Sequence, residues 1–302
     1  MPRRIHVFLA ERFPVLPGVS VAAILFGEIY FLVLLTNRTA VGPVRLGGEE
    51  AVGAYTLLAF LLTLRIADDL KDFQTDKRLF PDRPLADGRV RRGDVIVLMA
   101  VVDVLAIGLN VAFMNNLGWF AFLAVYGTAM SFWFFAKAKI QPNLMLALVT
   151  HNPVQIVMNL YVISFAAYKY GIPLITLPNV AIALTLYFPG LVWEVARKLR
   201  APEQETDYVT YSKLFGPAKP LRFILAILAV DLLTTGYLLY QLYPWAAVLV
   251  LVPYVWLVWQ ARRWLAGPTA FTLVSRVQWY EYAAEGTVVV LIAASLAGWG
   301  HG

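Results

Sequence analysis

Cysteine is absent from the 302 residues of this chain, and charged residues are scarce at 15%. The absence of cysteine excludes disulfide bonds, thiolate metal sites and a cysteine nucleophile. Soluble domains carry charge on about a quarter of their residues. With 60% hydrophobic residues and a mean hydropathy of +0.67, the composition indicates an integral membrane protein. Arg3 and Arg4 are not followed by a short apolar run and a small-residue cleavage site, so we expect a retained N-terminal segment rather than a signal peptide.

Apolar stretches of about 20 residues, the length of a transmembrane helix, recur between charged or Pro/Gly-rich breaks. The sequence predicts about nine such spans, at 15–36, 50–68, 94–114, 118–136, 143–166, 173–195, 221–242, 244–261 and 277–298. We therefore expect an all-α membrane protein in which residues 1–302 form a single multi-pass transmembrane domain.

The distribution of Lys and Arg predicts how these spans are oriented. If the N-terminus is inside, 21 of the 25 basic residues lie in inner segments, and only Arg38, Arg45 and Lys169 lie outside. Such an excess marks the cytoplasmic side of a membrane protein. We expect a protein of the cell (plasma or inner) membrane with a cytoplasmic N-terminus and an outer C-terminus. Topology and an anionic ligand account for the net charge of +6, so no nucleic-acid partner is expected.

Two of the expected inner loops are long and rich in charge, and the first begins with an acidic helix end. Asp68, Asp72 and Asp76 are spaced by four residues, which on a helix places their carboxylates on one face, one turn apart. Like charges at this spacing destabilise a helix unless a cation compensates them. Mg²⁺ suits one or two carboxylates together with substrate phosphates. Arg83 follows closely, and its guanidinium has the geometry for bidentate phosphate contact.

This region, DDLKDFQTD followed by DRPLADG, resembles the first signature of the UbiA-type intramembrane prenyltransferases, an N/D-x-x-x-D-x-x-x-D helix end before an N-R-P-L/I-x-x-G turn. Asp68, Asp72 and Asp76 fall on its acidic positions, and Arg83 and Pro84 fall on its Arg–Pro turn. The resemblance implies a UbiA-like bundle of nine helices with two acidic cytoplasmic loops. It also implies Mg²⁺, a polyprenyl diphosphate donor and a lipophilic acceptor in the lipid bilayer.

The second inner loop agrees with this family in charge and position but departs from it in sequence. Glu194, Arg197 and Lys198 are spaced i, i+3 and i+4, and Glu194 matches the first acidic position of the family's second motif by charge. Further acidic residues follow at Glu203, Glu205 and Asp207. Glu203 or Glu205 matches the later position only if a small insertion is allowed. Two alternatives remain: Glu194 and Lys198 form an ordinary ion pair, or Arg197 and Lys198 hold diphosphate oxygens directly.

Ionisable and amide side chains inside the spans are the remaining candidates, because such groups at membrane depth face a bundle interior or a cavity. The ionisable ones are Glu28, Asp103, Asp231, Glu281 and Glu285. Interhelical hydrogen bonding is the alternative role for them. In the fifth span, polar residues recur with helical period and predict a pocket-lining face, namely His151, Asn152, Gln155 and Asn159.

Together with the resemblance, these patterns define the candidate site. The expected catalytic residues are Asp68, Asp72, Asp76, Arg83 and Glu194. The expected metal ligands are Asp68, Asp72, Asp76, Glu194 and Glu205. The expected substrate-binding residues are Arg65, Lys71, His151, Asn152, Gln155, Arg197, Lys198, Tyr211 and Lys213.

Three functions are compatible with these residues. The first is Mg²⁺-dependent transfer of a prenyl group from a polyprenyl diphosphate to an aromatic or lipid acceptor. The second is a terpene cyclase on the same fold, which ionises the diphosphate and closes the cation on its own chain; the departure in the second motif permits this. The third is a transporter or lipid-binding protein without chemistry, whose helices would be broken at mid-membrane by Gly or Pro.

Overall fold

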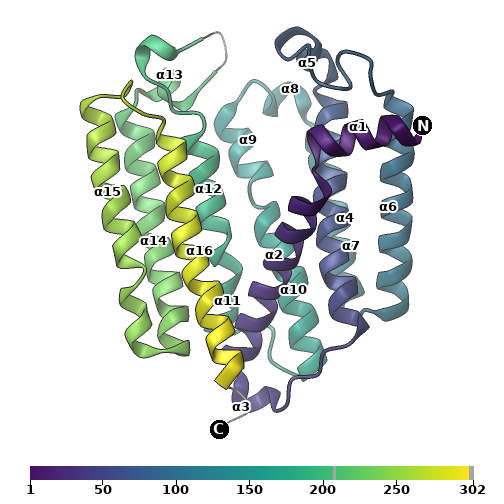
Figure 1. Cartoon of the computed structure of the whole chain (residues 1–302), viewed down its shortest axis with the longest axis vertical. Helices are drawn as coiled ribbons and strands as arrows, with labels where there is room; N and C mark the ends of the chain where they lie inside the picture. Colours follow the sequence, from purple (N-terminus) through teal and green to yellow (C-terminus); the bar gives the residue numbers. More distant parts are fainter. Residues whose placement is uncertain (207–208, 299–302) are drawn as a thin grey trace. The chain divides into compact units, whose positions relative to one another are not determined.

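The structure is a computed structural model that describes residues 1–206 and 209–298, and every regular element in these ranges is a helix (Figure 1). The α-helices are α1 (Pro2–Arg12), α2 (Val15–Thr36), α3 (Arg38–Val41), α4 (Gly48–Lys71), α5 (Phe73–Leu79), α6 (Arg92–Phe113), α7 (Leu117–Ser131), α8 (Lys137–Ile140), α9 (Leu144–His151), α10 (Val154–Tyr170), α11 (Leu177–Thr185), α12 (Tyr187–Ala196), α13 (Tyr211–Phe215), α14 (Ala218–Leu242), α15 (Leu251–Ala266) and α16 (Leu273–Gly298). Short 3-10 helices lie at Trp133–Phe135, Pro202–Gln204 and Pro244–Val248.

Eight helical segments of the described chain are long and apolar enough to cross a membrane, each coinciding with a predicted span. They are Val15–Thr36, Gly48–Lys71, Arg92–Phe113, Leu144–Tyr170, Leu177–Ala196, Ala218–Leu242, Pro244–Ala266 and Leu273–Gly298.

The predicted span at 118–136 is occupied by α7, which is shorter than expected. This helix has 15 residues, or about 22 Å at 1.5 Å per residue, against a hydrocarbon core of about 30 Å. It ends at Ser131 because the chain then turns through Trp133, Phe134 and Phe135, whose φ angles of 54°, 49° and 57° lie in the left-handed region. A ninth crossing at this place stays a prediction.

Two predicted spans are interrupted where proline removes a backbone donor. Pro153 precedes α10 and separates it from α9, and Pro189 lies in the first turn of α12, just after the break that ends α11. The first acidic loop instead begins where α4 passes into α5. Each break divides a membrane-length segment into two shorter helices. The hydropathy pattern alone predicts one continuous helix in each case.

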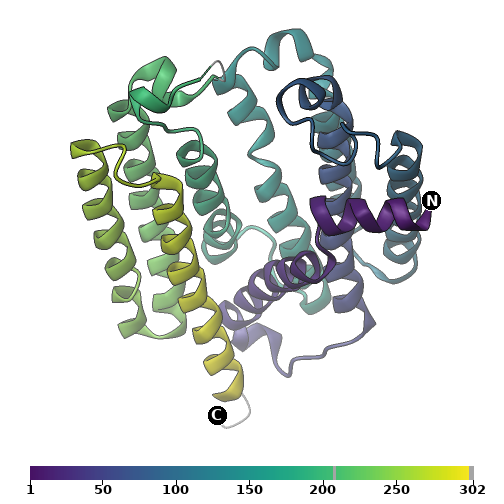
Figure 2. The same ribbon diagram turned by 45° about the horizontal axis from the view of Figure 1, so that its top comes forward.

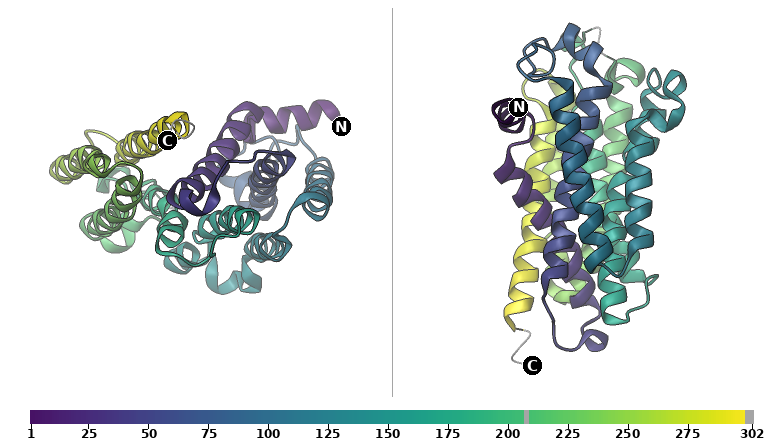
Figure 3. Two further views of the ribbon diagram at one scale, coloured as in Figure 1. Left: turned by 90° about the horizontal axis from the view of Figure 1, so that it is seen from below. Right: turned by 90° about the vertical axis from the view of Figure 1, so that its right-hand side faces the viewer.

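The described residues group into two compact units, each considered by itself. Unit 1 comprises Met1–Gly27 and Pro43–Ala138. In it, α4 and α6 run side by side (Figure 3), and α1 lies across their direction near the acidic end of α4 (Figures 1 and 2). A buried apolar cluster contains Phe8 of α1, Ile66 of α4 and Val95 of α6, and also Leu85 and Val90 of the loop that joins α5 to α6. That loop is therefore anchored to the helices rather than free in solvent.

Unit 2 comprises Glu28–Gly42 and Lys139–Gly302, within the described residues. Its core lies among α12, α14, α15 and α16, where Val192, Leu228, Leu257 and Val277 are almost fully buried. The helices α14, α15 and α16 follow one another as neighbours in the chain and in space (Figure 2). This packing holds the second acidic loop, which connects α12 to α14.

Candidate active site

The acidic end of α4 keeps its helical spacing into α5. The amide of Asp72 donates to the carbonyl of Asp68 at 3.0 Å, and the amide of Asp76 donates to that of Asp72 at 2.8 Å. Asp72 itself is the residue between the two helices, with φ −97° and ψ 6°. The three carboxylates therefore stay about one turn apart on the same side, as their spacing predicted.

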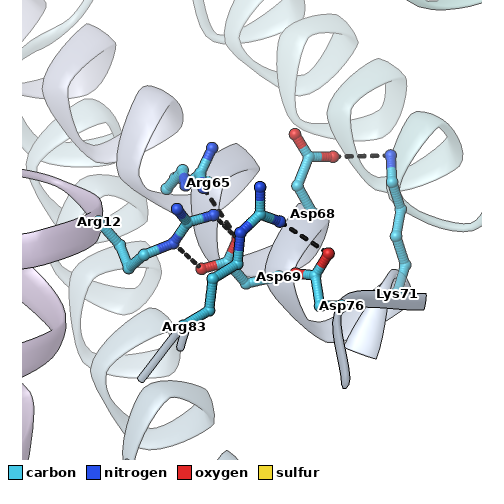
Figure 4. A network of polar contacts seen from close by, with 7 residues as sticks. All are labelled: Arg12, Arg65, Asp68, Asp69, Lys71, Asp76 and Arg83. Carbon is cyan, nitrogen blue, oxygen red and sulfur yellow. Dashed lines mark hydrogen bonds and ion pairs between the residues drawn. The ribbon is translucent and has the colours of Figure 1, made fainter. Parts of the chain in front are cut away.

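The three carboxylates of this ridge have different partners (Figure 4). Lys71 Nζ lies 2.7 Å from Asp68, whose side chain is 46% exposed. Asp76 is buried and accepts a hydrogen bond of 2.7 Å from Arg83 Nη1. Asp72 forms neither a hydrogen bond nor an ion pair within the described ranges. The ridge thus consists of one exposed, one unpaired and one buried carboxylate.

A fourth carboxylate, Asp69, lies near Asp76 and Arg83 and joins α4 to α1. Arg12 donates two hydrogen bonds to it, both at 2.8 Å, and Arg65 Nη2 lies 3.1 Å away (Figure 4). Arg65, which the sequence assigned to substrate binding, therefore pairs with Asp69 in this structure. Arg12 was not among the predicted residues, because its partner is 57 positions away and no local spacing links the two.

Asp72 has the electrostatic properties expected of a residue that binds a cation. Burial raises the pKa of Asp72 above its usual value, and the nearby carboxylates of Asp68 and Asp76 raise it further, while Lys71 and Lys137 lower it. A divalent cation at this carboxylate would offset both effects, so the donor chemistry fits Mg²⁺. No group of three or more acidic or histidine side chains in the described residues is placed to hold a metal. Mg²⁺ commonly takes only one or two carboxylates beside phosphates and waters, and Asp68 and Asp72 meet that requirement.

An apolar cavity of about 600 Å³ lies among α4, α6 and α7, all within unit 1. Lys71 and Lys137 line one end of it, and its walls include Phe60, Leu123 and Gly127. Lys137 has no ion-pair partner in the portion of the chain that is described. Cavities of this size and polarity bind small ligands in proteins. An unpaired cation at one end fits a ligand with an apolar body and an anionic head.

The strained turn after α7 builds that end of the cavity. A left-handed conformation costs a non-glycine residue about 1–2 kcal/mol, and such strain gathers at functional sites. Here it places the Trp133 ring under Lys71, with Nζ 4.9 Å from the ring centroid, and leads directly into Lys137. Neither residue was among the predicted site residues, and Lys137 counted only as one of the inner positive charges. A lysine two residues after an aromatic run, at the inner end of a predicted span, is the signal that was present.

One predicted intramembrane carboxylate, Asp103, lines the same cavity. Thr63 Oγ1 donates a hydrogen bond of 2.6 Å to it across α4 and α6. This contact is the interhelical bonding that was the alternative role for such residues.

In unit 2, the candidates of the second loop form two separate groups. Glu194 pairs with Arg197 and with Lys198, the latter at 2.8 Å. Glu205 instead accepts hydrogen bonds from the hydroxyls of Thr210 and Ser212. The ordinary ion pair considered for Glu194 and Lys198 is therefore present, and Glu194 and Glu205 have no partner in common.

The remaining residues of this loop support its local structure. Thr210 caps α13, Tyr211 is buried, and Lys213 Nζ donates to the carbonyl of Thr206 at 2.7 Å. Asp207 lies outside the described residues.

The predicted polar face of the fifth span is partly engaged in helix packing. Gln155 Nε2 donates to Asn159 at 2.9 Å, and Asn159 donates to the carbonyl of Ala183 in α11. The oxygen of the Asn152 side chain is buried without a hydrogen bond, and His151 Nδ1 lies 3.0 Å from the hydroxyl of Thr150.

Comparison with known proteins places the fold. No family model matches the sequence, and no curated protein matches it. A solved structure described as digeranylgeranylglyceryl phosphate synthase in membranes matches with a TM-score of 0.68 at 14% identity, covering 98% of this chain and 99% of that chain. The chain is a multi-pass membrane protein with the fold of the UbiA-type intramembrane prenyltransferases, as the motif at Asp68 predicted. The particular structure that it resembles is a synthase of that type.

Proposed function

We propose that this protein transfers a prenyl group from a polyprenyl diphosphate to a lipophilic acceptor within the membrane. The observation that carries the proposal is the position of Lys71 and Lys137 at one end of an apolar cavity of about 600 Å³, with Asp72 near enough to both lysines to interact electrostatically with them. An ionic head and an apolar chain would both be accommodated in one unit of the fold. The structural neighbour, a digeranylgeranylglyceryl phosphate synthase, supports the same reaction class.

In this proposal the charged residues bind the diphosphate and the cavity binds the chain. Asp68 and Asp72 would hold Mg²⁺, which when bound supplies neutralising charge for the diphosphate. Lys71 and Lys137 would contact the diphosphate oxygens, and Arg83 would do so from its ion pair with Asp76. These fixed positive charges favour the leaving group most when its carbon–oxygen bond breaks, because its negative charge is then greatest.

The aromatic and apolar walls would protect the allylic cation that remains. Aromatic faces attract cations by about 0.5–2 kcal/mol, and Trp133 already contacts the ammonium of Lys71. The bond to the acceptor then forms as the acceptor loses a proton. We further propose that the loops rich in basic residues are cytoplasmic and that the membrane is the plasma or inner membrane. A role for Glu194 or Glu205 at a second metal belongs to the same proposal.

Release of diphosphate tests the proposal directly. Purified full-length protein in nanodiscs is incubated with Mg²⁺ and prenyl diphosphates of increasing length, with and without aromatic acceptors. We expect Mg²⁺-dependent release that Asp72→Asn reduces by at least about a hundredfold, the equivalent of 2.7 kcal/mol.

The control is Gln74→Asn, which changes an exposed side chain of the same loop and should keep wild-type release. No release from any donor would refute the proposal. A terpene hydrocarbon or alcohol formed without acceptor would identify the protein as a cyclase instead.

A further inference from the structure

The apolar cavity of unit 1 has a closed end opposite its charged end. Thr56 is the first residue of α4 to line the cavity, and Lys71 is the last. Asn110 Nδ2 of α6 donates a hydrogen bond of 2.8 Å to Thr56 Oγ1, and both side chains are buried. Thr56 Oγ1 also donates to the carbonyl of Val52, one turn further from the cavity. This buried polar contact joins α4 to α6 and closes the cavity at that end.

The distance between the two ends determines how much of a chain the cavity holds. Lys71 Nζ lies 2.7 Å from Asp68, so the charged end is level with Asp68. From Asp68 to Thr56, α4 rises by about 18 Å, at about 1.5 Å per residue. An isoprene unit adds four bonds to an extended chain, or about 5 Å, because three bonds span about 3.8 Å between successive Cα atoms. The cavity therefore has the length of about three extended isoprene units.

The cavity also opens at its side, between α6 and α7. These two helices are joined by a short connection and run in opposite directions. Each lines the cavity with a row of residues one turn apart, and we call the two rows the side opening: Met99, Asp103 and Ile107 in one row, and Ala124, Thr128 and Phe132 in the other. Ile107 and Phe132 are 51% and 60% exposed although they line the cavity. Within the described residues, no hydrogen bond or ion pair crosses from one row to the other.

The side opening is polar at its middle and apolar at its deeper end. Asp103 is level with Thr63 of α4, whose hydroxyl donates a hydrogen bond to it, and this places a carboxylate at the middle of the opening. Ile107 lies one turn further from the charged end, and Ala124 lies at the corresponding end of the other row. Taking a carboxylate out of a polar environment is costly. An apolar chain therefore leaves the cavity more favourably beside Ile107 and Ala124 than beside Asp103.

We propose that the cavity holds the first three isoprene units of the donor and that any further units pass between Ile107 and Ala124 into the bilayer. The donors are then prenyl diphosphates of three or more units, and the closed end sets no upper limit. A donor with two units leaves the space beside Thr56 empty, and apolar walls without a partner lose their packing contacts. The inference rests on the proposed function for the position of the diphosphate and for the reaction. The way in which the cavity receives a chain does not depend on that reaction.

A series of donors tests the wild type. Full-length protein in nanodiscs is assayed for diphosphate release with donors of two, three, four and nine units, each at the same mole fraction of the lipid, so that partition into the bilayer does not favour the longer ones. From two to three units, kcat/KM should rise by at least about tenfold, because contacts with remote parts of a substrate contribute to the rate. From three to nine units it should change by less than about threefold. The Kd values of the corresponding S-thiolodiphosphates, which ionise slowly, should follow the same steps.

Closing the side opening tests the path of the longer chains. Ala124→Trp places an indole at the deeper end of the opening, where a fourth unit would have to pass. The ratio of kcat/KM for four units to that for three should fall by at least about tenfold, as should the ratio of the two affinities. Ala121→Trp is the matched control, since it makes the same change at an exposed position of α7 outside the cavity lining, and it should keep the wild-type ratios. If Ala124→Trp does not fold, Ile107→Trp closes the opening from α6 with the same expected result.

Several outcomes would overturn the inference. Two-unit donors that bind and react as well as three-unit donors would show that the chain does not reach Thr56. A sharp loss at four units in the wild type would show that the chain cannot leave through the side. Binding that is independent of chain length would show that bilayer lipid, and not the donor, fills the cavity. Stepwise binding of the S-thiolodiphosphates without release from any donor would refute prenyl transfer alone, and release without these steps would refute this inference alone.

Discussion

The ion pair between Arg12 and Asp69 gives the most specific prediction about stability. It joins the first helix to the acidic end of α4 through two hydrogen bonds of 2.8 Å, and the side chains are 14% and 6% exposed. Removing one partner of a buried pair costs about 3–5 kcal/mol, because a charge is left buried without compensation. Arg65, which lies 3.1 Å from Asp69 in this structure, would still compensate part of that charge. We therefore expect Arg12→Gln to cost about 2–3 kcal/mol, below the full range.

A double-mutant cycle separates the pair from general damage to the helix. Arg12→Gln, Asp69→Asn and the double variant are compared by thermal unfolding in the same detergent. The coupling energy should lie at about 1.5–3 kcal/mol, within the range of contacting residues. Arg3→Gln is the control, since Arg3 is exposed on the same helix and forms no ion pair within the described residues. Equal losses for Arg12→Gln and Arg3→Gln, or strictly additive effects in the cycle, would refute the reasoning.

Three further predictions concern the cavity, its charged end and the topology. Lys137→Gln should raise the KM for the prenyl diphosphate by about 10- to 100-fold in a steady-state assay, because a hydrogen bond to a charged group contributes about 1.5–3 kcal/mol; an unchanged KM would remove Lys137 from the diphosphate site. Gly127→Ala places a Cβ 2.5 Å from Cε2 of Phe60, which must then shift within the cavity that both residues line. The ratio of kcat/KM between long and short donors should fall, and an unchanged ratio would show that the chain does not occupy this cavity. Because the chain has no cysteine, single substitutions test the topology: Arg78→Cys should react with an impermeant maleimide only from the cytoplasmic side and Lys169→Cys only from the outer side, and the opposite result would contradict the predicted orientation.

The sequence by itself determined the class of fold and the main acidic motif. A membrane helix needs a run of about 20 apolar residues, and this local requirement is visible in the chain without reference to other segments. The spacing of Asp68, Asp72 and Asp76 is equally local, because one turn of helix brings these positions together in any fold. For this reason the spans and the carboxylate ridge were both predicted, and the comparison with a solved structure confirmed the fold.

The tertiary structure decided which charged residues are paired and which remain available. Asp69 and Asp72 look alike in the sequence, yet Asp69 is paired with Arg12 and Arg65, while Asp72 forms no ion pair in the described residues and lies near Lys71 and Lys137. Glu194 and Glu205 also differ in their partners. The hydroxyls of Thr210 and Ser212 donate hydrogen bonds to Glu205 and not to Glu194. Such pairings depend on contacts between distant positions, and hydrophobic periodicity carries no information about them.

The same distinction explains Lys137 and Glu28, which the sequence placed only as a positive-inside charge and as an intramembrane carboxylate. Their surroundings differ from what the sequence shows: an apolar cavity lies beside Lys137, and Glu285 of α16 lies beside Glu28. Local spacing determines which helices form and which faces carry charge, because helical geometry acts over a few residues. The presence or absence of a partner for a buried charge is a property of packing, because it is decided by helices that meet only in the folded chain.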